Sequence, residues 1–412
     1  MKVLKKKLTI GILSVMLAVP VTVSSFAAGP GQFASLDNET YARLMDNKAE
    51  WDEIENLVTY YNPTYRMYAD SVEATNDDLS TARDTFRDEM NDSIDLIDKN
   101  LETVKKQRDD LSKLPQAMPI DQYGTTAGMA GAQLSAAEDS LKEARTQAKE
   151  GLKQGNKMVA STIDKTKKAL KPARLQLTKT IETLFISYSQ LLINRSLVEK
   201  QVSLYETMLG TQNALYSQNM ASAADVASAT ATLAQSRVTL TQVDNGINQL
   251  RSAIGIQLGW NTDNPPEIGT VPAPDINFVL TTNKEEDYKK AIEENSAYED
   301  IGKVKNYNGA SAVYQRDAAI NEANAEYSAK FDSLYAAMQE KKLLYDAAQT
   351  SLSIAALSKD KAQRMYNLGL TGKAEYEGMQ LQYLSSEAAT SLASLSLTQA
   401  INDYKWAVKG LM

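Results

Sequence analysis

The sequence contains neither cysteine nor histidine. Without them the chain has no disulfide framework, no thiol nucleophile, and none of the commonest zinc ligands or triad bases. Catalysis by paired carboxylates stays chemically open, but it needs a concave site, and the long helices described below offer little concavity. We therefore expect a protein that is not an enzyme and that has no metal site and no cofactor.

Long apolar runs are also scarce, and the one that exists lies at the N-terminus. Four lysines precede an apolar stretch over residues 8–23, and Ser25, Phe26 and Ala27 follow it. This order predicts a secretory signal over residues 1–27, with an uncleaved membrane anchor as the alternative. Beyond it, no stretch approaches the ~18 apolar residues of a spanning helix.

Positive charge is in deficit, since the net charge is −8 and becomes −12 when the four lysines of the signal are removed. Such an acidic chain is not expected to bind nucleic acid. Tyrosine (20 residues) outnumbers phenylalanine (6 residues). A tyrosine can bury its ring and keep its hydroxyl hydrated, which suits thin helical bundles.

What the sequence does have is one heptad pattern that occurs twice. A 3-4 spacing of apolar and small residues predicts a narrow stripe along one helix face, which must be buried against another helix. Adding 150 to each residue number of the first copy gives the second. The first copy comprises Val226, Ala229, Leu233, Ser236, Leu240, Val243, Ile247, Leu250 and Ile254; the second comprises Tyr376, Met379, Tyr383, Ser386, Thr390, Ala393, Leu397, Ala400 and Tyr404.

The breaks that precede the two stripes repeat at the same offset. Residues 219–222 (NMAS) correspond to residues 369–372 (GLTG), and both are short polar or glycine-containing interruptions between helices. The chain is therefore predicted to be all-α, with a duplicated pair of long antiparallel coiled-coil helical hairpins.

Proline and glycine divide the chain further. We expect a lead-in at 28–47, a first helical repeat at 48–260, a Pro-rich linker at 261–283 with one short strand near 276–280, and a second repeat at 284–412. The first repeat includes a polar helical excursion over about 69–170, with its turn at 116–131. Pro172 predicts a kink or a restart of the helix, and residues 306–309 predict a turn.

The breaks carry a family resemblance. Residues 366–376 (YNLGLTGKAEY) resemble the tip motif of the TolC family of outer-membrane efflux ducts: an aromatic, Gly-Leu, a small residue, an acid and a further aromatic. Residues 216–226 (YSQNMASAADV) look like a degraded copy with Asn219 where glycine is usual, and residues 62–65 (NPTY) match the family's opening motif. The resemblance covers about residues 48–412.

The resemblance implies that three protomers assemble into a hollow α-barrel whose tips dock on a periplasmic-type adaptor and an ABC-type or other exporter in the inner membrane. The tip residues would then be the docking site. They are Asn219, Ser222, Asp225, Gly369, Leu370, Thr371, Gly372 and Glu375.

The resemblance also implies that each half supplies two β-strands to a barrel through the outer membrane, and the sequence departs from the family there. Such strands need ~9–11 residues of alternating character, and neither 116–131 nor 306–311 offers them. We expect a TolC-like α-barrel protomer without a clear β-barrel. Its expected location is the outer membrane if the host has one, and otherwise the extracytoplasmic cell envelope. The alternative is a coiled-coil scaffold of the envelope with no conducting role.

Each candidate tip residue also has a simpler interpretation. Asp225 and Glu375 can cap helix N-termini; the resemblance to the TolC family implies instead, or in addition, an acidic ring that lines the entrance. Gly369 and Gly372 can serve the turn alone or also touch a partner. Residues 369–373 do not form a phosphate loop, because the position of its first glycine holds Asn367 and Ala374 replaces the Ser or Thr that would hold magnesium.

Overall fold

The computed structural model describes residues 37–44, 46–122, 125–261, 263–295, 298 and 310–412. The predicted signal at 1–27, half of the lead-in and the predicted turn at 306–309 lie outside these residues. Within them, no helix combines the length with the apolar composition needed to cross a bilayer.

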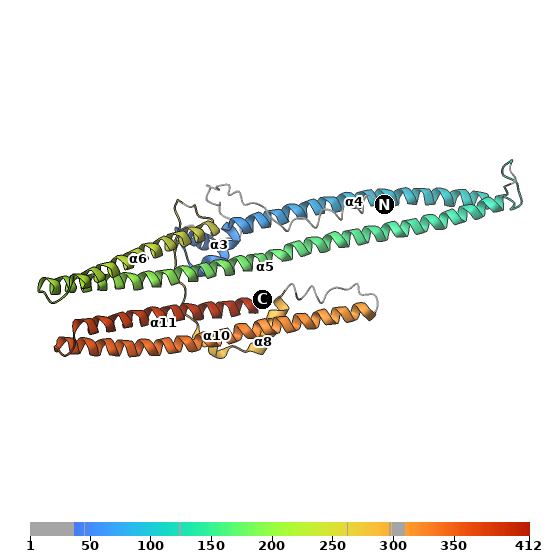
Figure 1. The fold of residues 1–412 in the computed structure, drawn as a ribbon. Helices are drawn as coiled ribbons and strands as arrows, with labels where there is room; N and C mark the ends of the chain where they lie inside the picture. The colour runs from blue at the N-terminus through green and yellow to red at the C-terminus, as the bar shows by residue number, and fades with distance from the viewer. Residues whose placement is uncertain (1–36, 45, 123–124, 262, 296–297, 299–309) are drawn as a thin grey trace.

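Two antiparallel helical hairpins lie side by side and make up most of the molecule (Figure 1). In the first, α5 (Ala127–Ser217) turns back into α6 (Ala223–Gln257); in the second, α10 (Ala310–Asn367) turns back into α11 (Lys373–Val408). The first part of α5 pairs instead with α4 (Pro63–Leu111). The predicted all-α fold of two long hairpins is confirmed.

Short elements surround the middle of the hairpins. They are α2 (Asn38–Leu44), β1 (Lys48–Ala49), the 3-10 helix η1 (Trp51–Glu53), α3 (Ile54–Tyr61), β2 (Glu267–Ile268), α7 (Ile276–Thr281) and α8 (Lys284–Glu294). β1 and β2 pair in parallel, with Lys48 opposite Glu267. This pairing ties the segment after α6 to the segment before α3.

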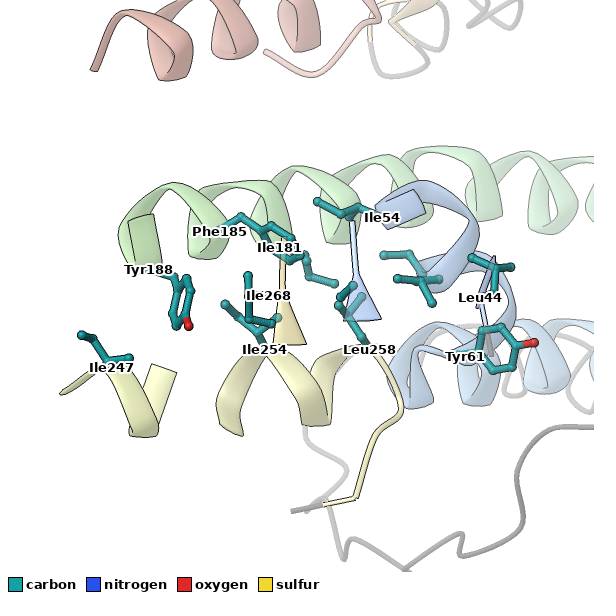
Figure 2. Packing of buried hydrophobic residues seen from close by; sticks show 13 residues of the cluster. Leu44, Ile54, Tyr61, Ile181, Phe185, Tyr188, Ile247, Ile254, Leu258 and Ile268 are labelled. Atoms are coloured by element: carbon teal, nitrogen blue, oxygen red, sulfur yellow. The ribbon is translucent and has the colours of Figure 1, made fainter. Parts of the chain in front are cut away.

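The stripe of the first repeat faces a core at the base of the first hairpin (Figure 2). Ile247 and Ile254 of α6 meet Ile181 and Phe185 of α5, and α3 closes the cluster with Ile54. Trp51 adds an edge-to-face contact with Phe185. Burying an aliphatic or aromatic side chain of this size stabilises the fold by about 1.5–3 kcal/mol, so this cluster anchors the short elements to the hairpin.

The second repeat has the same arrangement with more aromatic content. Leu397 and Tyr404 of the α11 stripe pack on Phe331 and Met338 of α10, and all four are fully buried or nearly so. The ring centroids of Phe331 and Tyr404 are 5.0 Å apart. Both stripes are thus buried against the other helix of their own hairpin, as their spacing predicts.

The duplication extends to the place where each short helix meets the base of its hairpin. Asn62 follows α3 and Asn295 follows α8; both are buried, and each side chain accepts the N–H three residues later. The stripe helices α6 and α11 end near these sites on Gly259 and Gly410, with φ of 88° and 90°.

A side chain on Gly259 or Gly410 would collide with the backbone of the short helix that the glycine approaches. A Cβ on Gly259 would lie 2.6 Å from the Tyr61 carbonyl oxygen, and one on Gly410 would lie 2.5 Å from that of Glu294. Tyr61 and Glu294 are the residues just before the two asparagines. Only glycine allows this close approach with a positive φ. Both repeats therefore use the same joint, by which we mean the contact between the glycine that ends the stripe helix and the end of the short helix.

The excursion is a long two-helix arm, made of α4 and the first part of α5. Polar contacts join its two helices: the buried Asn76 accepts from the Thr166 hydroxyl at 2.7 Å, and the partly exposed Arg145 and Asp98 pair at 2.5 Å. Gly155 lets α5 approach the ring of Phe86. Since α4 has 49 residues, it is about 70 Å long at ~1.5 Å per residue.

Three local predictions need correction. The helix does not restart at Pro172, which lies inside a continuous 91-residue α5, because packing continues before it, through Thr166 on Asn76, and after it, through buried Leu175. The expected strand near 276–280 is helix α7, capped by Asp275 at the N–H of Phe278. The lead-in contains helix α2 rather than only loop.

Candidate functional site

The two predicted tips adopt one turn. Asn219 and Gly369 have φ of 57° and 69°, and the backbone N–H of each donates to a carbonyl three residues earlier. The next N–H, that of Met220 or Leu370, donates five residues back at 2.8 Å in both cases. This is the Schellman arrangement that ends a helix on a left-handed residue. Asparagine tolerates that conformation better than other side chains, so Asn219 can replace a glycine.

Both tips lie at the same end of the molecule, opposite the far end of the arm (Figure 1). The sequence predicts each tip separately. The fold places both tips at one end, because the two hairpins lie side by side and point in the same direction.

The first tip closes with a capping box. The Ser222 N–H donates to Asp225 Oδ2 at 2.8 Å, and the Asp225 N–H donates to Ser222 Oγ at 3.2 Å. The bonds from Ser222 hold the pKa of the Asp225 carboxyl below its usual value. The capping interpretation of Asp225 is therefore confirmed.

The second tip is built differently at the matching residues. Gly372 is the N-cap and offers no side-chain acceptor, while the Thr371 hydroxyl donates to Glu375 Oε2. Tyr366 and Tyr376 stack across the turn with 5.3 Å between ring centroids and 9° between planes. A tyrosine stack and a threonine-bound carboxylate hold this tip in place of a capping box.

A polar bridge joins the second tip to the first hairpin. Lys373 donates to the Thr211 hydroxyl of α5 and lies 3.7 Å from Glu377 Oε1. Glu377 is buried, and its Oε1 accepts no hydrogen bond. Lys373, Glu377 and Thr211 are not among the predicted tip residues. The i,i+4 spacing of Lys373 and Glu377 is visible in the sequence, but the contact with Thr211 depends on tertiary structure.

Both tips expose apolar side chains. Met220 is 63% exposed, and Leu368 and Leu370 are 72% and 69% exposed. A solvent-open hollow of about 550 Å³ lies elsewhere, beside Lys48, Tyr188 and Arg251. The exposed apolar side chains therefore lie on the hairpin turns, and this hollow lies away from them.

Scans for known relatives give structural matches only. No protein-family model matches the chain, and no curated protein matches it either. Among solved structures, a membrane protein from Pseudomonas aeruginosa is 11% identical, with 87% of this chain and 93% of that chain covered and a TM-score of 0.52.

Two further solved structures have lower TM-scores. The outer-membrane protein VceC from Vibrio cholerae is 13% identical (63% and 76% covered, TM-score 0.45), and the outer-membrane channel OprN is 11% identical (93% and 95% covered, TM-score 0.47). At these identities the comparison establishes fold alone. The chain shares the long-helix fold of the Pseudomonas aeruginosa membrane protein. A fold of this kind is what the resemblance of residues 366–376 to the TolC tip motif implies.

Proposed function

We propose that this chain is the exported protomer of a TolC-like efflux or secretion duct, a passive conduit that works with an adaptor and an exporter of the cytoplasmic membrane. The observation that carries the proposal is the pair of matched tips at one end, each exposing apolar side chains beyond a rigid turn. The duct performs no catalytic step, and the energy for transport comes from the partner exporter.

The outer face of α10 supports assembly into a homotrimer. Leu343, Ile354 and Leu357 share one helix face and are 70%, 60% and 70% exposed. The opposite face of α10 already packs on α11 through Phe331 and Met338. An unpaired apolar stripe at heptad spacing calls for another helix, and a second copy of the chain supplies one.

In this proposal the eight tip residues form the docking surface. Leu370 would make the apolar contact of the second tip, and Gly369 would set its position; Asn219 would set the position of the first tip. Asp225 and Glu375 already bind Ser222 and Thr371, so their first role is to fix the turns, and an acidic ring would be a second use of the same carboxylates. The bridge from Lys373 to Thr211 would hold the tips in register, and its release would open them.

The first experiment is a measurement of assembly. We expect the purified chain to form a hollow trimer by light scattering and electron microscopy, and Ile354→Lys with Leu357→Lys to dissociate it. Leu96→Lys, at an exposed apolar position on α4, is the matched control. A wild-type chain that stays monomeric at all concentrations would refute the duct.

The second experiment tests the tips in the producing cell. Leu370→Asp should abolish transport while the trimer and its helix content remain unchanged. Transport at wild-type level would remove the docking role from this tip.

An envelope scaffold without a conducting role is the second candidate, favoured by the long arm whose two helices are joined by a side-chain hydrogen bond and an ion pair. Such a rod suits a spacer. Reconstitution into planar bilayers separates the two, because a duct conducts ions and a scaffold does not.

A further inference from the structure

The far end of the arm differs from the rest of the arm in charge. The arm is rich in ionic side chains, yet residues 114–137 contain one charged residue, Asp121, in a chain that is 23% charged. The Asp121 side chain is engaged locally, since it accepts from the Thr125 N–H at 2.9 Å. We call the described residues of this stretch, 114–122 and 125–137, the distal cap.

Apolar side chains gather on this cap. Leu114, Met118, Ile120 and Met129 are 38%, 45%, 40% and 58% exposed. Along the much longer sides of the arm, over residues 63–113 and 138–171, the large apolar side chains exposed to a similar degree are Met67 and Tyr68 near its base, and Leu96 and Met158. The apolar surface is thus concentrated at the end of the rod.

Three backbone hydrogen bonds join the two strands of the loop within the cap. The N–H of Ile120 donates to Thr125, that of Ala127 to Met118 and that of Gly128 to Gln116, at 2.9–3.0 Å. Pro115 and Pro119 carry no N–H. Each of these bonds lowers the cost of bringing the loop backbone to the boundary of a lipid phase, where the apolar side chains insert and the remaining backbone groups stay near water.

We propose that the distal cap inserts its apolar side chains into a lipid surface and anchors the arm there. A lipid surface fits better than a protein partner. A stable protein interface needs about 800 Å² from each partner, which the tip of a two-helix rod with four exposed apolar side chains does not offer. Interfacial insertion needs only a few such side chains.

The contact is hydrophobic rather than electrostatic. The cations nearest to the cap are paired with carboxylates, Lys113 with Asp110 at 2.8 Å and Arg108 with Asp109 at 3.0 Å. Binding should therefore occur on zwitterionic phosphatidylcholine and should change little when added salt screens surface charges.

The test uses the purified chain with a fluorophore at one site. Because the chain has no cysteine, Met118→Cys accepts a single environment-sensitive label. Phosphatidylcholine vesicles should shift its emission to the blue, and a lipid-borne quencher should reduce it. A label on Met220→Cys, exposed at the opposite end, is the matched control and should respond to neither.

A second measurement removes the apolar surface. Met118→Ser with Ile120→Ser should lower partitioning onto vesicles by about tenfold or more, while Leu96→Ser leaves it unchanged and all variants keep their helix content. The proposal fails if the label at 118 stays in water beside vesicles, if it shifts with protein concentration alone, or if salt abolishes binding. None of these outcomes bears on trimer formation or transport.

Discussion

Trp406 donates its indole N–H to the carboxylate of Glu182, with 2.5 Å between Nε1 and Oε2, across the boundary between the two hairpins. The Asn402 amide donates to the same oxygen at 2.5 Å. Lys179 and Asp403 pair beside them at 3.0 Å. This cluster joins α5 to α11 near the middle of the molecule, so the hairpins are held together by buried hydrogen bonds.

The first prediction concerns Glu182. Burial raises the pKa of its carboxyl above the ordinary value of 4.5, and the bonds from Asn402 and Trp406 oppose that rise. Since the folded state binds the proton more tightly, ionisation of Glu182 destabilises the fold, and this cost appears as the pH rises above about 4.5. Glu182→Gln should remove it, so the variant should gain stability relative to wild type between acid and neutral pH, measured by urea denaturation.

The matched variant is Trp406→Phe. It keeps most of the ring but leaves the carboxylate with one donor fewer, which should cost about 1–3 kcal/mol. If Glu182→Gln were the more damaging of the two at neutral pH, the ionised carboxylate would be stabilising and the prediction would be wrong.

The second prediction compares two glycines with the same sign of φ. Gly369→Ala should cost about 1–2 kcal/mol, because only the backbone conformation is unfavourable and nothing lies within 4 Å of the new Cβ. Gly410→Ala should cost more, because its Cβ would also meet the Glu294 carbonyl oxygen at 2.5 Å. Thermal unfolding of both variants checks the order, and equal losses would contradict the close joint.

The third prediction concerns Asn62, whose side chain donates to the Gln257 carbonyl at 2.6 Å and accepts from the Tyr65 N–H at 2.7 Å. Asn62→Ala should cost about 1–3 kcal/mol. Asn62→Asp should cost more, because it keeps the acceptor but sets a buried carboxylate against the carbonyl oxygen. Chemical denaturation measures both, and a milder effect of Asp would contradict the assigned donor.

The fourth prediction concerns the capping box. Ser222→Ala should lower the stability of the first hairpin by about 1 kcal/mol and should raise the pKa of Asp225 towards its ordinary value of 3.8, as carbon-detected NMR titration would report. Because the folded pKa is depressed, the contribution of Asp225 is present above about pH 3.8 and is lost below it. Ser228→Ala, on the exposed face of α6, is the control and should change neither quantity.

The sequence by itself determined the repeating parts of this protein. The spacing from Val226 to Ile254 and from Tyr376 to Tyr404 requires two helices with a buried stripe each, and the polar breaks at 219–222 and 369–372 require two reversals. The same offset of 150 residues indicated that the two hairpins share one design. These are local signals, because helix period and turn chemistry depend on neighbours along the chain.

Tertiary structure alone decided how the hairpins meet and where the local rules give way. Pro172 stays inside α5 because the residues before it pack on α4, through Thr166 and Asn76. The residues after it, from Ile181, pack in the core of the first hairpin. Residues 276–280 form a helix because Asp275 caps them and Val279 packs in the second core. The contacts of Glu182 with Trp406 and of Lys373 with Thr211 join residues more than 150 positions apart, and no pattern along the chain specifies which helix faces will be neighbours in space.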